Sequence, residues 1–255
     1  MTTLTTATTD SLTMLRRSLR HTLRSPDTMI LAIALPVILL VLFVYVFGGA
    51  MNVGTEYLNY VVPGIILLCA GFGASTIATA VSSDMTEGVV DRFRTMAVSQ
   101  RAILTGHVGA SVLRNLVTTA IVVTVAVLMG FRPSAGPLEY LAAIGVVALF
   151  VLAISWLCVA LGLLAANPEA ASGFTFFLLF LPYVSSAFVP PESMPSWLRG
   201  FAEHQPVTPV IETLRGLLTG TPIGNSAMLA VGWCLAITVV GYVWARATFR
   251  RKTLH

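Results

Sequence analysis

The stretch YLAAIGVVALFVLAISWLCVALGLLA, residues Tyr140–Ala165, contains 26 residues and no charged side chain. As a helix it would be about 39 Å long, and the hydrocarbon core of a bilayer is about 30 Å thick. The whole chain has the same character, because 56% of its 255 residues are hydrophobic and only 10% are charged. A typical soluble domain is about 25% charged, so the composition predicts an integral membrane protein.

Further apolar segments on both sides of this stretch predict an all-α protein with six transmembrane helices in a single domain, residues 1–255. Residues 190–225 carry only a short helical pattern of about 13 residues, roughly 20 Å, which cannot cross a bilayer. We therefore predict short re-entrant or interfacial helices in that segment, between the fifth and sixth spans. The six predicted spans cover residues 29–47, 58–81, 108–129, 140–165, 173–189 and 227–245.

Residues 10–25, before the first span, predict an amphipathic helix that lies in the membrane interface. Its leucines recur every three or four residues and make one apolar stripe. Arginines cover the other sides, where they can meet anionic headgroups. The alternative is the basic start of a signal peptide, but the apolar run that follows is long for one. The arginines of this interface helix are Arg16, Arg17, Arg20 and Arg24.

The segment Ser82–His107, SSDMTEGVVDRFRTMAVSQRAILTGH, is a charged island between two apolar runs. Together with the N-terminal segment and the C-terminal tail, this island, counted through Arg114, holds 12 of the 15 Lys and Arg residues. The positive-inside rule places such segments in the cytoplasm. We therefore predict that both termini and the loop 82–107 are cytoplasmic. The excess of basic residues reflects topology and lipid headgroups, and no nucleic-acid-binding pattern accompanies it.

The sequence contains no pattern typical of an enzyme. It has no GxxxxGK[ST] phosphate loop, and its only lysine is Lys252, so any ATP must bind to another chain. His107 and His204 fall on opposite sides of the predicted membrane and cannot share a site. No acidic residue lies in the middle of a predicted span, which disfavours an ion-coupled or passive carrier working without an ATPase but leaves it as the alternative.

Two stretches carry a resemblance to a known family. The first is DMTEGVVDRFRTMAVS, residues Asp84–Ser99, in which Ala97 stands where the family commonly has proline. The second runs from Phe188 to Leu217 and includes FVPPESMPSW and HQPVTP. With these motifs the chain resembles, over its full length, the permease subunit of a type-2 ABC exporter, close to the actinobacterial daunorubicin-resistance-type permeases.

The resemblance implies a type-2 ABC exporter transmembrane domain in the plasma membrane of a bacterium. Such a permease works with two copies of a separate ATPase chain, which bind ATP and Mg²⁺, and with a second permease that is either identical or related. The implied function is export of a hydrophobic or amphipathic substrate, drug-like or lipid-like, from the cytoplasm or inner leaflet by alternating access at the dimer interface. This chain itself is expected to bind no cofactor and to catalyse no reaction.

The resemblance also suggests three groups of site residues, each with a simpler alternative. The charged loop would hold a coupling helix that docks on the ATPase, or its charges would only solvate the loop and set topology. Aromatic side chains of the fifth span would line the substrate path, or would face lipid or fill the core. An acidic and a basic residue would pair at an extracellular gate, or would be solvated. The respective residues are Asp84, Glu87, Gly88, Asp91, Arg92 and Arg94 for coupling, Phe176, Phe177, Phe180 and Tyr183 for the path, and Glu212 and Arg215 for the gate.

Overall fold

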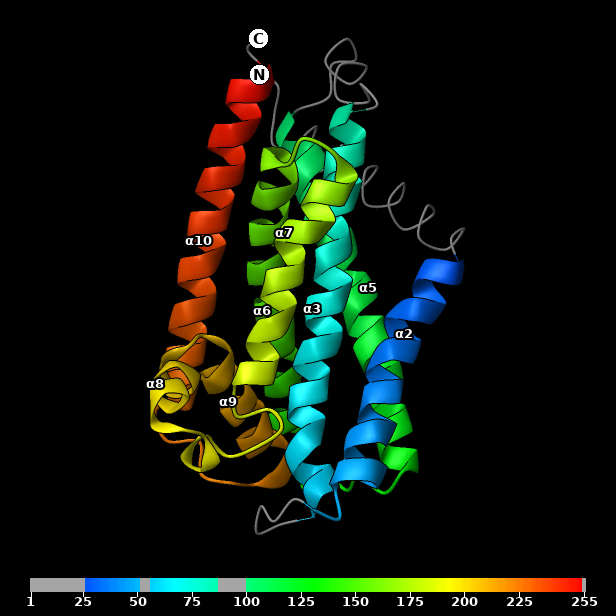
Figure 1. Ribbon diagram of the computed structural model, residues 1–255, viewed down its shortest axis with the longest axis vertical. Coiled ribbons are helices and arrows are strands. Elements are labelled where there is room, and N and C mark those ends of the chain that lie inside the picture. The colour runs from blue at the N-terminus through cyan, green and yellow to red at the C-terminus, as the bar shows by residue number, and fades with distance from the viewer. Residues whose placement is uncertain (1–25, 51–55, 87–99, 254–255) are drawn as a thin grey trace.

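The computed structural model describes residues 26–50, 56–86 and 100–253, and within these ranges the chain forms helices and no strand (Figure 1). This confirms the predicted all-α membrane fold. The longer helices are α2 (Pro26–Val41), α3 (Tyr57–Thr86), α5 (Gln100–Leu128), α6 (Pro137–Leu164), α7 (Pro168–Phe180) and α10 (Ser226–Thr253). The shorter elements are the π-helical turn η1 (Leu42–Phe47), the 3₁₀ turns η2 (Leu181–Val184) and η3 (Pro191–Ser193), and the helices α8 (Ser196–His204) and α9 (Val207–Thr219).

Within the described residues, four helical stretches are long and apolar enough to cross a membrane by length and composition: Tyr57–Thr86, Leu104–Leu128, Pro137–Leu164 and Ser226–Lys252. Two shorter apolar stretches, Ala32–Phe47 and Pro168–Val184, fall where the first and fifth spans are predicted. The second of these begins earlier than its predicted span, because Asn167 caps it by accepting a hydrogen bond from the Ala170 amide at 2.8 Å. The chain is therefore a multi-pass membrane protein.

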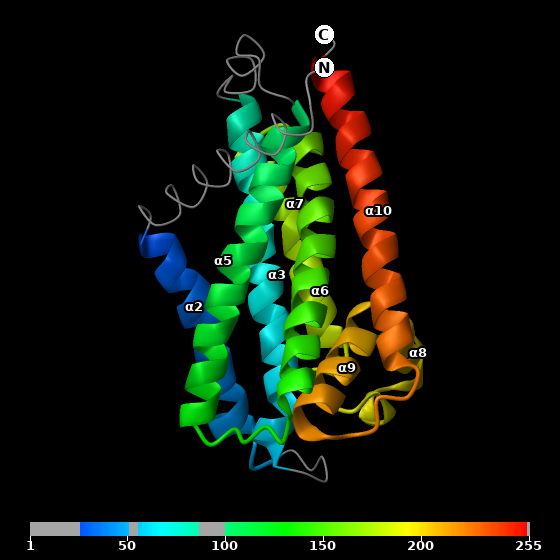
Figure 2. The ribbon, with the colours of Figure 1, turned by 180° about the vertical axis from the view of Figure 1, so that it is seen from behind.

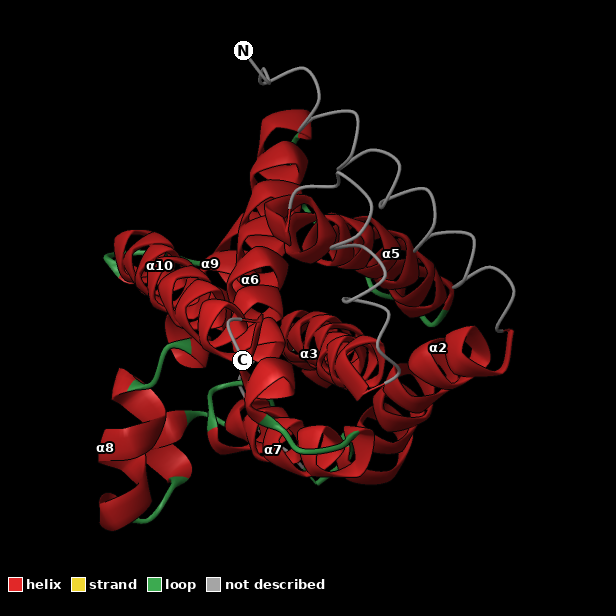
Figure 3. Cartoon of the chain, turned by 90° about the horizontal axis from the view of Figure 1, so that it is seen from above, coloured by secondary structure: helices red, strands yellow, loops and turns green. Residues whose placement is uncertain are grey.

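Helix α3 lies in the middle of the bundle, with α2, α5, α6 and α7 around it (Figure 3). Of its most apolar 18-residue window, 78% is buried, against 17% for the corresponding window of α10. Helix α10 packs chiefly against α6 and leaves most of its apolar surface exposed. The bundle thus has one enclosed central helix and a peripheral helix suited to contact lipid.

A close approach of two backbones joins α3 to α6. A Cβ atom added at Gly162 would lie 2.9 Å from the Cα atom of Ala78, closer than real Cβ atoms come. Between membrane helices the contact surfaces favour small residues, because association depends on close packing rather than on expulsion of water. Gly162 therefore sets the distance between α6 and the central helix.

The two ends of the bundle differ. The C-terminal end of α3, the N-terminal end of α5 and the C-terminal part of α10 lie at one end, and the short helices α8 and α9 lie toward the other (Figures 1 and 2). Helix α9 packs against α3, α6 and α10, whereas α8 contacts α9, η2 and η3. We call the first end the inner end and the second the outer end, following the predicted topology.

We predict that Gly162→Ala destabilises the protein by about 1 to 3 kcal/mol, because the new methyl group forces the α3 and α6 backbones apart. The matched control is Gly145→Ala in the same helix, where an added Cβ meets nothing within 4 Å. The stability of each variant is measured as its midpoint of thermal unfolding in detergent, which is monitored through the fraction of protein that stays monodisperse. Equal midpoints for the two variants would contradict the close packing at Gly162.

Candidate functional site

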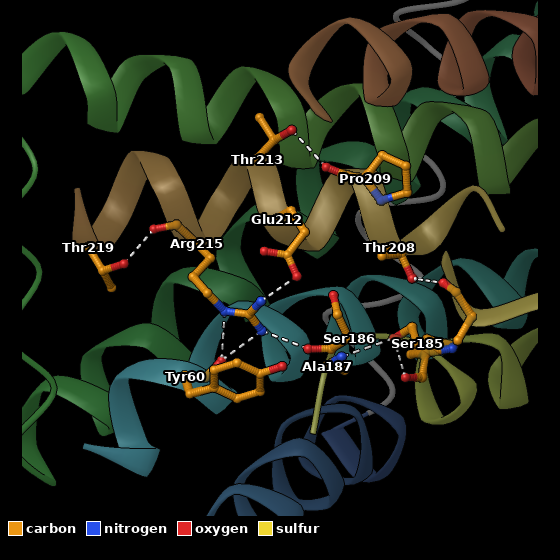
Figure 4. A network of polar contacts seen from close by, with 12 residues as sticks. Tyr60, Ser185, Ser186, Ala187, Thr208, Pro209, Glu212, Thr213, Arg215 and Thr219 are labelled. Atoms are coloured by element: carbon orange, nitrogen blue, oxygen red, sulfur yellow. Dashed lines mark hydrogen bonds and ion pairs between the residues drawn. The ribbon is translucent and has the colours of Figure 1, made fainter. Parts of the chain in front are cut away.

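A buried arginine organises the outer end of the bundle (Figure 4). Arg215 of α9 is only 6% exposed. Its Nη1 donates to Glu212 Oε1 at 2.6 Å, and its Nη2 donates to the carbonyl oxygens of Ser186 at 2.7 Å and Tyr60 at 3.1 Å. The guanidinium carbon lies 3.8 Å from the centroid of the Tyr60 ring, a cation–π contact. We call these four residues the outer polar cluster.

The local sequence explains how the cluster forms. Glu212 and Arg215 are three residues apart on α9, so their side chains share one helix face. The turn after η2 is held by Ser185, whose hydroxyl donates to the Pro182 carbonyl at 2.5 Å and accepts from the Ala187 amide at 3.1 Å. This turn lies directly on α3, since a Cβ at Gly64 would be 2.6 Å from the Cβ of Ala187. Arg215 therefore ties α9, α3 and this turn together.

The sequence left two outcomes open for the Glu212–Arg215 pair, and the two side chains are paired, with Arg215 buried and Glu212 partly exposed. No sequence pattern indicates that Tyr60 and Ser186 belong to the same cluster. Tyr60 is 155 residues from Arg215, and Ser186 contributes its backbone carbonyl. A backbone acceptor has no sequence pattern, so only the packing of α9 on α3 could reveal it.

The four predicted path residues lie together on α7 and η2. Phe176, Phe177 and Phe180 are 55%, 73% and 49% exposed. The ring of Phe180 lies 4.9 Å from that of Phe176 and 6.1 Å from that of Tyr183. Their exposure indicates that they do not fill the core of this chain.

Three further rings continue this row toward α2. Tyr183 stacks on Phe188 with centroids 5.5 Å apart, and Phe188 stacks on Phe43 at 4.0 Å. Phe43 lies 5.6 Å from Phe47 at the end of η1. We call the seven rings from Phe177 to Phe47 the aromatic ladder. Its second half was missed from sequence, because Phe43 and Phe188 are adjacent only after the turn at 185–188 folds back.

A small apolar cavity lies on another side of α7. It has a volume of ≈ 20 Å³, and Leu68, Phe150, Thr175, Leu178 and Pro182 are among its lining residues. Sites for drug-sized ligands occupy about 300 to 1,000 Å³, so this cavity cannot hold a substrate. None of the four predicted path residues lines it. Because Phe176, Phe177 and Phe180 are exposed, the described part of the chain forms at most one wall of a path along the aromatic ladder.

At the inner end, an acid–histidine contact joins α3 to α5. The Asp84 carboxylate lies 2.9 Å from His107 Nε2, and both side chains are largely buried, at 20% and 16% exposure. Asp84 is thus placed at the base of the predicted coupling loop and points at α5. The other predicted coupling residues, Glu87, Gly88, Asp91, Arg92 and Arg94, and the interface arginines Arg16, Arg17, Arg20 and Arg24, lie outside the described residues.

Polar contacts also join the central helices within the bundle. Arg114 Nη2 of α5 donates to the Gly73 carbonyl at 2.9 Å and to Thr76 Oγ1 at 2.5 Å, both on α3. The Ser155 hydroxyl of α6 donates to Ser111 Oγ of α5 at 3.3 Å. Helices α3, α5 and α6 are therefore connected by hydrogen bonds.

An enclosed central helix and exposed apolar helices at the periphery define a multi-pass membrane protein. Residues 9–219 match the ABC-2 type transporter family, and the chain belongs to that family. This confirms the predicted family.

Two relatives indicate the subunit type. The chain is 35% identical over 218 residues to the daunorubicin resistance ABC transporter permease protein DrrB1 of Streptomyces coeruleorubidus. The aligned region covers 85% of this chain and 77% of that protein. It is 29% identical over 241 residues to the probable doxorubicin resistance ABC transporter permease protein DrrC of Mycobacterium tuberculosis. That alignment covers 94% of this chain and 87% of DrrC. The chain is accordingly an ABC transporter permease subunit, which is not itself catalytic.

We predict that Arg215→Lys destabilises the protein by about 2 kcal/mol or more, because an ammonium cannot bond Glu212 and two carbonyls and also stack on Tyr60. Thermal unfolding in detergent measures the loss.

The matched control is Arg199→Lys, which alters an exposed pair in which Arg199 Nε donates to Glu203 at 2.6 Å. The hydrogen bond to Glu203 and the charge of Glu203 raise the pKa of Arg199. An exposed i,i+4 pair contributes well under about 1 kcal/mol. If Arg215→Lys were as mild as Arg199→Lys, the outer polar cluster would not stabilise the outer end.

Proposed function

We propose that this permease forms the membrane path of an ATP-driven exporter for hydrophobic or amphipathic molecules, taken from the cytoplasm or inner leaflet. The observation that carries the proposal is the aromatic ladder. Its exposed rings on α7 offer one wall of a path, while the cavity on the other side of α7 is too small to be that path. A second permease, identical or related, would supply the opposite wall and make alternating access at their interface workable.

The chemistry of the ladder favours flat, partly apolar cargo. Aromatic rings attract other rings in stacked or edge-to-face contacts worth about 0.5 to 1.5 kcal/mol beyond area burial. The relatives are named for resistance to daunorubicin and to doxorubicin. A drug of this shape, or a lipid-like molecule with an apolar body, suits the exposed faces of Phe176, Phe177 and Phe180.

Energy would come from two copies of a separate ATPase that bind ATP and Mg²⁺. The predicted coupling loop follows α3 directly, and the Asp84–His107 contact holds together the two helices that flank it. Membership in the ABC-2 family supports an ATPase partner over a carrier working alone. The basic residues at the inner ends of the helices support a bacterial plasma-membrane location with cytoplasmic termini.

We predict that the double charge reversal Glu87→Arg with Arg92→Glu abolishes stable association with the ATPase, because like charges would then face each other at the docking surface. Co-purification of the ATPase and substrate-stimulated ATP hydrolysis by the complex report the effect. The matched control reverses Glu56 and Arg132, which flank the outer ends of α3 and α5 and are exposed. Unchanged association in the first variant would refute docking through these charges, and the loop would then serve topology alone.

We predict that cysteines introduced at Phe176 and Phe180 are modified by maleimides in at least one nucleotide state and that substrate slows the reaction. A thiol reacts as the thiolate, which forms where water reaches it and not in lipid. The control is Val239→Cys on α10, which is 60% exposed but faces the predicted lipid belt and should stay unmodified. The native Cys69, Cys158 and Cys234 are buried and provide a low background. If positions 176 and 180 resist modification in every nucleotide state, the ladder does not line a path.

A further inference from the structure

A single charged residue, Glu169, stands in the elements that carry the aromatic ladder. These elements are η1, α7, η2 and the turn 185–188, and apart from Glu169 their sequences contain no Asp, Glu, Lys or Arg. Glu169 lies in the first turn of α7, which begins at the inner end of the bundle (Figure 1). The one charge on these elements is therefore negative, and it stands at the end from which the proposed cargo enters.

The Glu169 carboxylate shares a helix face with two rings of the ladder. Phe176 and Phe180 follow Glu169 by seven and eleven residues, which places all three within about 40° of each other around the axis of α7. The axial rise from Glu169 to Phe176 is about 10 Å. Glu169 is exposed, and so are both rings. A molecule of drug-like length that lies along this face can therefore meet the carboxylate and the rings together.

The side chain of Glu169 has no other task within the described residues, where it makes no hydrogen bond and no ion pair. Asn167 supplies the cap of α7, because its side chain accepts from the Ala170 amide at 2.8 Å. Lys252 of α10 reaches the same turn, but its Nζ donates to the Ala165 carbonyl at 3.2 Å. Within this part of the chain the carboxylate is therefore available to a cation from outside.

The rings of the ladder attract the same sign of charge as the carboxylate. A cation within about 6 Å of the centroid of an aromatic ring is drawn to the negative face of that ring. Phe176, Phe177 and Phe180 are exposed, and α7 and η2 carry no Lys or Arg that would repel a cation. An anion on this face would meet a repelling carboxylate and no basic side chain of these two elements. Both features thus favour positively charged cargo.

We propose that Glu169 binds the positive charge of the cargo at the inner end of the aromatic ladder, and that the preferred cargo is an aromatic organic cation. Both statements rest on the proposed function, whose substrate class they narrow. The carboxylate holds the charged group while the apolar body lies against Phe176 and Phe180. A neutral molecule of the same shape keeps the ring contacts and loses the contact with Glu169, which therefore determines specificity.

The test compares two probes that share one fused-ring skeleton, the cation N-methylacridinium and the neutral N-methylacridone. Each probe is added to the purified permease–ATPase complex in lipid nanodiscs, and the concentration that gives half-maximal stimulation of ATP hydrolysis is measured. We expect the wild-type complex to respond to the cation at the lower concentration. Glu169→Gln should raise the half-maximal concentration of the cation about fivefold and leave that of the neutral probe unchanged. Glu169→Asp should restore most of the preference.

Two further variants separate specificity from stability. A carboxylate in the first turn also stabilises a helix through the helix dipole, but this role cannot distinguish the two probes. The matched control is therefore Glu139→Gln, which removes the first-turn carboxylate of α6 and should change neither response. Gly173→Lys keeps Glu169 and is tolerated, because an added Cβ at Gly173 meets nothing within 4 Å. Its ammonium, four residues from Glu169, should weaken the response to the cation alone.

Three results would overturn the proposal, and they distinguish it from the proposed function. If Phe176→Ala weakens both responses while Glu169→Gln and Gly173→Lys affect the two probes equally or not at all, the ladder lines the path without selecting for charge. If Phe176→Ala changes neither response, the path along the ladder is itself wrong, and the binding of cations there falls with it. A wild-type complex that does not prefer the cation would contradict the substrate class directly.

Discussion

The enclosure of α3 is the constraint on which the rest of the structure depends. Lipid chains are as apolar as leucine, so helices in a bilayer gain little by hiding apolar side chains and must associate by close packing. Helix α3 achieves this through direct backbone approaches, to α6 at Gly162 and to the 185–187 turn at Gly64. Each peripheral helix then has one face that packs on the centre and another face that stays exposed in this chain. Helices α7 and α10 both have such an exposed face, which is left for lipid or for another chain.

Burial of Arg215 is the second determinant, because an unpaired cation in an apolar setting costs several kcal/mol. The cost is offset only if Glu212, the carbonyls of Tyr60 and Ser186, and the Tyr60 ring are all in place. That requirement fixes α9 against α3 and fixes the turn after η2 against both. A short helix that could slide on an apolar surface is in this way held at one position.

Composition, the length of the apolar runs and the proline-rich segment after α7 were sufficient to predict an all-helical membrane fold with short helices near the outer end, because these features depend on local pattern. The clustering of Phe176, Phe180 and Tyr183 could be predicted from their spacing on one helix. The contacts of Phe43 and Tyr60 and the contact between Asp84 and His107 could not be predicted, because each depends on which helices pack against each other. Helix ends also differ from the predicted spans, because α3 and α5 continue beyond their apolar stretches to Thr86 and Gln100.

The same central helix connects the predicted energy input to the outer polar cluster. Asp84 and Tyr60 are 24 residues apart on α3, about 36 Å along the axis. Arg114 bonds α5 to α3 partway along, so the two helices that flank the predicted coupling loop are joined at two levels. Within α3, Pro63 lacks the amide that would bond the Asn59 carbonyl, which weakens the helix in its outer turns. Arg215 donates to the Tyr60 carbonyl in that region and so braces the turn that Pro63 weakens.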